Sequence, residues 1–438
     1  MRKNKLWRAW YFYDFANSAY STTVITVFLG PFLTDLAKSA SNNEGFISVL
    51  GIEMAAGSLF PYAVSLSVLI QVLVLPIIGA VADHVQSRSR LMGLLASVGS
   101  ITTMLFYFIS VTNYQWAALL LIISNVAMGA SIVVYNSFLP DIAAPEERDQ
   151  VSARGWGLGY LGGGLLLALN VLLYLSASTI GIAEGDAVRI SLLSAGAWWF
   201  LFTRIPIKGL KALDRDSSRF RFGGIKVAFK DLRSTFQDAK RYPHTVRYLI
   251  AYLIYNDGIQ TVIAMAGTFA AEELGLPQTD LIIAILIVQF VALFGALGLG
   301  KLAVAIGARK VLMSSLLIWT VMLVFAYLLP RGAALLYYLL AALIGIVLGG
   351  SQSLSRSLFS QMIPRAQEAQ YFAIYELSER GTSWIGTFLF GLSLTLTGSY
   401  RISILALISF FIIGGILFSR VNLKRAIQES GNELPPVI

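Results

Sequence analysis

The sequence places one carboxylate, Asp257, about eleven residues into a long apolar stretch. At the rise of an α-helix this corresponds to a depth of roughly 16 Å. Ionisable residues are costly in such surroundings, so they are the first candidates for a functional site. A desolvated carboxyl is suited to carrying a proton, and Tyr255, Asn256 and Gln260 beside it can hydrogen-bond a polar solute. The alternative is that Asp257 accepts hydrogen bonds from a packed neighbour.

A second set of polar residues lies near the start of the first apolar stretch. Tyr13, Asp14, Asn17 and Tyr20 recur about one helical turn apart, which predicts a polar stripe on one helix face that lines a cavity. Their shallow position favours a gate near the inner surface over a central binding site. The alternative is that Asp14 completes the helix start by satisfying backbone donors.

Neutral polar residues interrupt two further apolar stretches. Asn136 and Gln352 are candidates to line the same pathway as Asp257, and the alternative for each is a hydrogen bond between neighbouring helices.

Charged residues near the inner ends of two later stretches are candidates for an inner gate. They are Arg356, Glu376, Glu379 and Arg380. Glu376 and Arg380 have i,i+4 spacing, so a local ion pair is the alternative.

A short polar loop, GAVADHVQSRSR, separates the second and third apolar stretches. Gly79 allows two helix ends to approach closely, and Asp83 followed by Arg88 and Arg90 predicts a charge latch that closes and breaks. We expect Asp83 and Arg88 to act together with the inner-gate candidates.

The elements that hold these residues follow from composition. The chain has 438 residues, of which 56% are hydrophobic and 13% charged. A membrane-spanning helix needs about 20 apolar residues, and the apolar blocks are too long for β-barrel strands. The predicted spans are 10–34, 58–82, 91–111, 115–138, 155–177, 189–206, 246–270, 279–300, 309–329, 333–359, 374–397 and 401–420.

The basic residues follow the predicted topology. With the N-terminus inside, all but four of the 33 lysines and arginines fall on the inner side. The four exceptions are Lys38, Arg189, Arg331 and Arg401. This asymmetry is typical of cytoplasmic loops, and it explains the net charge of +9 without a nucleic-acid partner. We therefore expect both termini in the cytoplasm.

The spans divide into two halves. Residues 1–206 form a predicted N-terminal six-helix bundle, 207–245 a basic cytoplasmic linker, and 246–438 a C-terminal six-helix bundle with a short cytoplasmic tail. Weak internal symmetry supports this division, since aligning Pro140 with Pro364 also aligns Gly162 with Gly386. Within the linker, Ile225, Phe229, Leu232 and Phe236 have helical spacing, which predicts an amphipathic helix at the membrane surface; a solvated linker is the alternative.

Several segments resemble one transporter family. The loop from Gly79 to Arg90 is similar to the signature loop of major facilitator transporters. WYFYDFANSAYSTTVITVFLGPFL, YNSFLPDIA, RGWGLGYLGGGLLL and GGSQSLSRSLFSQMIP resemble the vacuole effluxer-like branch of that superfamily. The resemblance implies an all-α integral membrane protein of twelve transmembrane helices in two pseudo-symmetric six-helix bundles. It also implies alternating access, and amino-acid export is attributed to the fungal members. Glu376 and Glu379 depart from the family pattern.

We therefore expect a secondary transporter of a small polar solute, with amino acids as the leading class and protons as the coupling ion. A lipid or amphiphile flippase of the same fold is the alternative within transport. A membrane-embedded enzyme is the alternative of another class, for which the acidic loop Asp141, Glu146, Glu147 and Asp149 is the candidate, although it reads better as solvated.

The expected partners and location follow from the same observations. We expect contact with membrane lipids, no obligate protein partner, and a multi-pass position in the inner membrane of a prokaryotic cell. No nucleotide cofactor is expected, because the glycine fingerprint from Gly157 to Gly162 lies in an apolar stretch with no preceding strand. No metal is expected, because the chain has no cysteine and its two histidines, His84 and His244, fall in predicted loops without neighbouring ligands.

Overall fold

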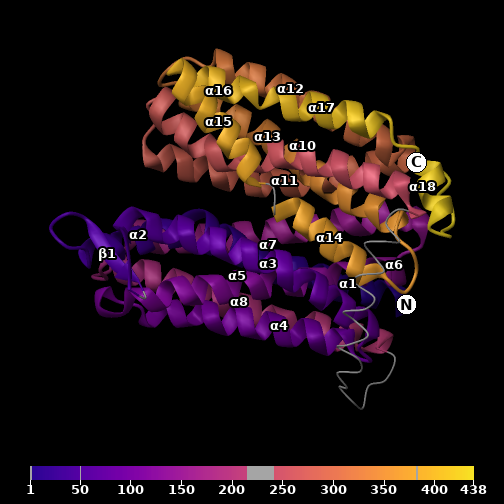
Figure 1. Cartoon of the computed structure of the whole chain (residues 1–438), viewed down its shortest axis with the longest axis horizontal. Coiled ribbons are helices and arrows are strands. Elements are labelled where there is room, and N and C mark those ends of the chain that lie inside the picture. Colours follow the sequence, from indigo (N-terminus) through magenta and orange to yellow (C-terminus); the bar gives the residue numbers. More distant parts are fainter. Residues whose placement is uncertain (1, 50, 215–240, 381–382) are drawn as a thin grey trace.

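The computed structural model describes residues 2–49, 51–214, 241–380 and 383–438. Its helices form two bundles that lie side by side, with both chain termini at one end of the molecule (Figure 1). We call this the terminal end, and we call the opposite end, which carries a small β-hairpin, the hairpin end.

The first bundle is built from the N-terminal half of the chain. Its elements are α1 (Arg2–Ala19), the π-helical η1 (Tyr20–Phe28), α2 (Leu29–Ser39), β1 (Phe46–Val49), β2 (Ile52–Ala55), η2 (Ala56–Ser58), α3 (Leu59–His84), α4 (Arg88–Met104), η3 (Leu105–Phe108), η4 (Val111–Asn113), α5 (Tyr114–Asn136), α6 (Leu139–Ile142), η5 (Pro145–Glu147), α7 (Arg148–Ser176), α8 (Glu184–Leu210) and η6 (Lys211–Leu213).

The second bundle is built from the C-terminal half. Its elements are α10 (Pro243–Thr268), the π-helical η8 (Phe269–Glu273), α11 (Gln278–Ile306), α12 (Ala308–Leu328), α13 (Ala334–Gln361), α14 (Glu368–Arg380), α15 (Ser383–Thr397), α16 (Tyr400–Ala406), α17 (Ile408–Ser419) and α18 (Leu423–Glu429).

The predicted helical membrane fold is confirmed. Among the described residues, ten helices are long and apolar enough to cross a membrane. The first predicted span corresponds to α1, η1 and α2, which follow one another without a gap from residue 2 to residue 39. The amphipathic helix predicted in the linker lies in 215–240, outside the described residues.

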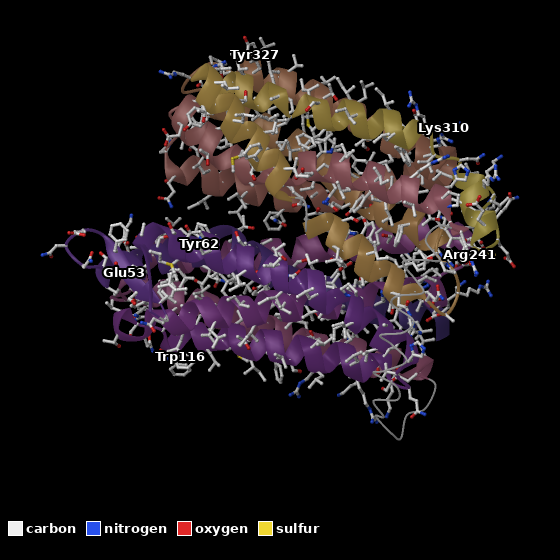
Figure 2. All side chains as sticks on the ribbon, viewed as in Figure 1. Glu53, Tyr62, Trp116, Arg241, Lys310 and Tyr327 are labelled. Atoms are coloured by element: carbon white, nitrogen blue, oxygen red, sulfur yellow. The ribbon has the colours of Figure 1, made fainter. Side chains whose placement is uncertain are left out.

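The eleventh predicted span covers α14, described as far as Arg380, and α15, described from Ser383. One feature differs from the predicted elements. The connection after the first span contains an antiparallel hairpin of β1 and β2, in which Phe46 pairs with Ala55 and Val49 with Ile52. Glu53 marks this hairpin at one end of the molecule, while Arg241 and Lys310 lie at the other (Figure 2).

The two halves pack against each other most closely towards the terminal end. Across the interface, α7 packs against α11 and α13, and α14 packs against α3 and α5. By contrast, α15 packs mainly against α10 and α16 within its own half. In the eleventh span, α14 therefore belongs to the interface between the halves, and α15 packs mainly within its own half.

Close glycine contacts are repeated in the two halves. A Cβ at Gly162 in α7 would lie 2.4 Å from the carbonyl oxygen of Phe15, and a Cβ at Gly386 in α15 would lie 2.0 Å from Thr261 Oγ1. The first contact joins the fifth span to the first, and the second joins the eleventh span to the seventh. The positions related by the sequence alignment thus make equivalent contacts, each too close for a larger residue.

Candidate functional site

A buried ion pair joins the two halves. Arg356, on α13, donates from Nη1 and Nη2 to Asp14 Oδ2 on α1, with 3.1 Å for each contact. The side chain of Arg356 is 3% exposed and that of Asp14 is 12% exposed. Asp14 Oδ2 also accepts from the Tyr135 hydroxyl at 2.8 Å. A charged pair so far from water depends on each partner to compensate the other.

Aromatic rings surround the guanidinium group. The Cζ atom of Arg356 lies 4.7 Å from the ring centroid of Trp10, 5.3 Å from Trp156 and 5.7 Å from Tyr135. Trp10 in turn donates to the carbonyl oxygen of Tyr135 at 3.1 Å. These π faces provide favourable electrostatic contacts for a cation that is removed from water.

The network extends to a second carboxylate. Asn136 Oδ1, at the end of α5, accepts from Arg356 Nη1 at 3.4 Å, and its Nδ2 donates to Glu376 Oε1 on α14 at 2.9 Å. Glu376 is buried. One guanidinium and two carboxylates from both halves are therefore connected within a single buried cluster, which we call the interhalf network: Asp14, Asn136, Arg356 and Glu376.

A polar contact between α7 and α13 extends this network towards the terminal end. Ser152 accepts from Arg356 Nε at 3.0 Å through Oγ and donates to the carbonyl oxygen of Ser353 at 2.7 Å. Asp149 accepts from Ser357 Oγ at 2.5 Å and is buried. The expectation that Asp149 belongs to a solvated loop was wrong, because α7 begins one residue earlier and presents this carboxylate to α13.

The predicted latch loop meets the eleventh span. Asp83 accepts from the backbone N–H groups of Ala369 and Gln370 at 3.0 Å each, so its carboxylate caps the start of α14 from the opposite half. Gly79 lies beside the same turn, where a Cβ would be 2.6 Å from the carbonyl oxygen of Ala369.

The arginines of that loop lie elsewhere. Arg88 pairs with Asp141 and stacks over Phe138, 4.7 Å from its centroid, so both contacts stay within the N-terminal half. Arg90 is exposed. Arg380 is the last residue of α14, and its side chain lies outside the described part of the chain.

A second polar cluster lies within the C-terminal half. Asn256 accepts from Gln352 Nε2 and donates to the carbonyl oxygen of Glu379, both at 3.4 Å. The Glu379 carboxylate accepts from the Tyr252 hydroxyl at 3.2 Å. Gln352 Oε1 is buried without a partner. Carboxylate, amide and phenol groups thus converge between α10, α13 and α14.

The remaining candidates on α10 have distinct surroundings. The Tyr255 hydroxyl shares a 2.7 Å hydrogen bond with Ser355, and Gln260 is half-buried one turn beyond Asn256. Asp257 Oδ2 accepts from the Gly386 N–H at 3.0 Å, while Oδ1 is buried without a partner.

Tyr13 and Tyr20, from the predicted polar stripe on the first helix, contact other residues of the N-terminal half. The Tyr20 hydroxyl lies 2.9 Å from Ser124 Oγ, and Tyr13 packs against Tyr135 with a centroid separation of 4.8 Å. Asn17 is buried, and its Nδ2 atom has no partner. Of this stripe, Asp14 is the residue that the described contacts place in the interhalf network.

Sequence reasoning did not select three partners of Arg356. Trp10, Ser152 and Trp156 contact its guanidinium, but apolar aromatics and single serines are common in membrane helices. A usable signal was present in α13, where residues 351–361 read SQSLSRSLFSQ and are buried throughout. Such a run of buried hydroxyls indicates a polar helix interface.

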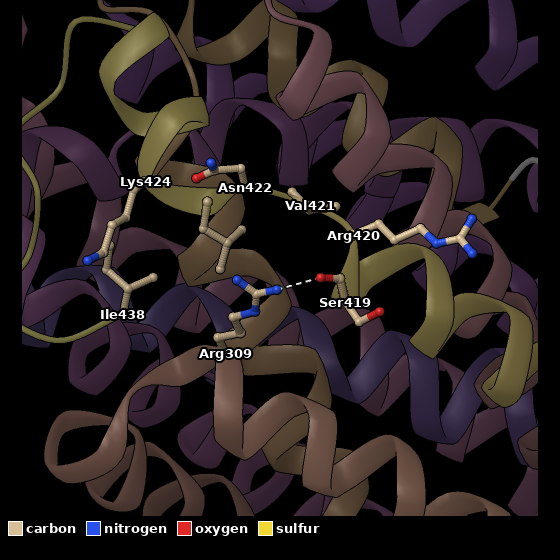
Figure 3. A pocket seen from close by; sticks show the side chains of 8 residues that line it. Arg309, Ser419, Arg420, Val421, Asn422, Lys424 and Ile438 are labelled. Carbon is tan, nitrogen blue, oxygen red and sulfur yellow. Dashed lines mark hydrogen bonds between the residues drawn. The ribbon is translucent and has the colours of Figure 1, made fainter.

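One pocket lies apart from these clusters. It has a volume of about 360 Å³ and is found at the terminal end of the C-terminal half, where Arg309 Nη2 donates to the carbonyl oxygen of Ser419 at 2.5 Å (Figure 3). Its lining, which includes Arg420, Lys424 and Ile438, contains no residue of the interhalf network. We therefore place the candidate site at the network between the halves.

Comparison with known proteins gives a consistent family. A family model described as "Vacuole effluxer Atg22 like" matches residues 2–431. The "Uncharacterized MFS-type transporter YxiO" of Bacillus subtilis (strain 168) is 28% identical, over 99% of both chains. "Autophagy-related protein 22-1" of Penicillium rubens is 26% identical, over 81% of this chain and 74% of the fungal one.

Solved structures share the fold. A bacterial homologue of the iron transporter ferroportin in an outward-facing state has a TM-score of 0.69 at 13% identity, over 96% of this chain and 99% of that one. The transporter FucP in the outward conformation has a TM-score of 0.68 at 12% identity, over 96% and 99% of the two chains. At these identities the likeness establishes the architecture alone.

Proposed function

The chain belongs to the vacuole effluxer Atg22-like family of major facilitator transporters, and we propose that it moves an amino acid or a related zwitterion across a membrane by alternating access. We place it in the inner membrane of a prokaryotic cell with both termini in the cytoplasm, which the distribution of basic residues supports. In that topology the sealed terminal end faces the cytoplasm, and the present arrangement is outward-facing. The outward states of the two structural neighbours support this assignment.

The interhalf network is the observation that carries the proposal. Asp14 and Arg356 belong to opposite halves, so the cytoplasmic side opens only when their hydrogen bonds break. While the pair separates and before water reaches it, leaving a buried charge without its partner costs about 3–5 kcal/mol. A transported molecule that replaces each lost partner removes most of this barrier.

A zwitterion has the matching chemistry. Its carboxylate pairs with the planar guanidinium of Arg356, and its ammonium pairs with Asp14 or Glu376. The rings of Trp10 and Trp156 offer additional contacts to a cation. A neutral sugar would leave both charges uncompensated when the halves part.

The test is uptake by the purified protein in proteoliposomes. Each amino acid is compared with its amide, which lacks the carboxylate charge, with its decarboxylated amine, and with its N-acetyl form, which lacks the ammonium. We expect transport of at least one zwitterion and loss of transport when either charge is removed. Arg356→Gln should abolish this uptake. Arg425→Gln should not, because Arg425 forms an exposed i,i+4 pair with Glu429.

Two results would contradict the proposal. Transport of sugars with no zwitterion transported would reject the assigned substrate class. Movement of lipids or amphiphiles alone would replace it with the flippase of the same fold.

A further inference from the structure

We propose that the pocket at the terminal end of the C-terminal half binds the phosphate group of an anionic phospholipid. The pocket has a volume of about 360 Å³ and lies between the start of α12, the end of α17 and the short helix α18 (Figure 3). One water molecule takes up about 30 Å³ of liquid, so the pocket has room for a phosphate group. This site is independent of which solute is transported.

Among the described residues, three basic side chains and no acidic side chain line the pocket: Arg309, Arg420 and Lys424. The hydrogen bond from Arg309 to the carbonyl oxygen of Ser419 satisfies one N–H group and leaves the positive charge in place. Arg420 and Lys424 are exposed. The α-carboxylate of Ile438, the last residue of the sequence, offsets at most one of these charges. The excess positive charge matches a phosphate group, which guanidinium and ammonium groups bind well.

A comparison of the two halves explains why Arg309 is left without an acidic partner. In the first half, Arg88 pairs with Asp141. In the second half, the loop at 300–310 corresponds to the latch loop and places Arg309 at the position of Arg88. The alignment of Pro140 with Pro364 places Arg365 at the position of Asp141. The ion pair of the first half therefore corresponds to two basic residues in the second.

The pocket borders surfaces that face lipid. Ile306, at the end of α11, is 41% exposed, and Ile416, on α17 one turn before Ser419, is 47% exposed. Apolar side chains that are exposed on membrane-spanning helices contact acyl chains. The basic residues lie just beyond this apolar surface, at the level of the lipid headgroups. Basic pockets in such a position bind anionic headgroups, so a phospholipid fits the site better than a soluble phosphate does.

A bound phosphate would connect helices of the C-terminal half. Arg309 belongs to the start of α12 and Lys424 to α18, so one phosphate in contact with both joins these helices. Beyond α18, Asn432 Nδ2 donates to the carbonyl oxygens of Gln361 at 3.0 Å and Ile363 at 2.7 Å, at the end of α13. We therefore expect the lipid to hold α18 more firmly against the end of the bundle.

Native mass spectrometry of the purified, full-length protein tests the site, with phosphatidylglycerol and phosphatidylcholine of identical acyl chains as probes. Both carry a phosphate group, but phosphatidylglycerol alone has a net negative charge. We expect the first phosphatidylglycerol to bind more tightly than the first phosphatidylcholine. Arg420→Gln with Lys424→Gln should weaken that binding about 30-fold, because two basic contacts are lost. Arg309 is kept, since its hydrogen bond to Ser419 holds two helix ends together.

The chain offers a matched control variant, Lys310→Gln with Arg425→Gln. Lys310 follows Arg309 on α12, and Arg425 follows Lys424 on α18. Both control residues are exposed, and neither lines the pocket. The control therefore removes the same net charge from the same end of the molecule, and its affinity for phosphatidylglycerol should stay within about twofold of the wild type.

Hydrogen–deuterium exchange locates the bound lipid. Addition of phosphatidylglycerol should slow exchange of the α18 amides in the wild type and in the control variant, but not in Arg420→Gln with Lys424→Gln. Exchange of the β1–β2 hairpin, at the opposite end of the molecule, should stay the same in all three proteins.

Three results would overturn the proposal. The first is equal affinity of the wild type for the two lipids. The second is an equal loss of affinity in the two double variants, which would indicate general attraction to a basic surface. The third is displacement of the lipid by excess inorganic phosphate that itself slows exchange in α18, which would assign the pocket to a soluble phosphate.

Discussion

Removal of the charge at Asp14 should shift the protein from the outward-facing to the inward-facing state. In Asp14→Asn the side chain keeps its shape and an acceptor for the Tyr135 hydroxyl, but Arg356 stays buried without its counter-ion. Loss of one partner from a buried pair costs about 3 kcal/mol. Because about 1.4 kcal/mol corresponds to a factor of ten, the ratio of the two states should change about 100-fold. The cost falls on the sealed state, since opening exposes Arg356 to water.

Distances between spin labels measure this shift directly. The chain contains no cysteine, so labels are introduced without removing native thiols. Exposed pairs are available at both ends: Thr112→Cys with Thr279→Cys at the hairpin end, and Glu146→Cys with Lys310→Cys at the terminal end. In Asp14→Asn the terminal-end distance should lengthen and the hairpin-end distance should shorten.

Two controls define the result that refutes this reasoning. Asp186→Asn removes an acid of the exposed pair with Arg189 and should change neither distance. The double variant Asp14→Asn with Arg356→Gln removes both buried charges and should return towards the wild-type distribution. Wild-type distances in Asp14→Asn would show that the pair does not hold the halves together.

Two glycine substitutions give further predictions. Gly79→Ala places a Cβ 2.6 Å from the carbonyl oxygen of Ala369 across the interface, so it should favour the inward-facing state, and the same spin-label pairs would report unchanged distances if the contact is unimportant. Gly295→Ala places a Cβ 2.2 Å from the carbonyl oxygen of Ile346 between α11 and α13 and should destabilise the fold by about 1–3 kcal/mol. Gly298→Ala, on the same helix with no atom within 4 Å of its Cβ, should be neutral or stabilising; equal unfolding temperatures for the two variants would contradict the packing argument.

Long apolar runs made the helical architecture predictable, but not the structure of the connections between the helices. The hairpin between Phe46 and Ala55 is short and lies in a polar connection, where hydrophobic spacing provides little guidance.

The sequence identified individual residues of the candidate site, but it did not predict which of them contact one another. Asp14 and Arg356 stand out individually because charges are rare in apolar helices. Their pairing joins positions 342 residues apart and depends on how the two halves meet, which helical periodicity does not encode. Ser152 and Asp149 were missed for a different reason. A serine carries little cost in a helix, and an acid beside other acids resembles a surface loop.

The contact between α7 and α13 also explains how the interface between the two halves can be buried in one state and separate in another. The hydrogen bonds across it join serine hydroxyls to a backbone carbonyl oxygen and to a carboxylate, in the contacts of Ser152 with Ser353 and of Ser357 with Asp149. Water satisfies such groups nearly as well as protein does. When the halves separate, water hydrates these polar groups and little apolar surface is exposed between α7 and α13. The closed and open states therefore remain close in free energy. Leucines in place of Ser152 and Ser357 would form an apolar contact whose exposure to water is costly, so the two halves would separate less readily.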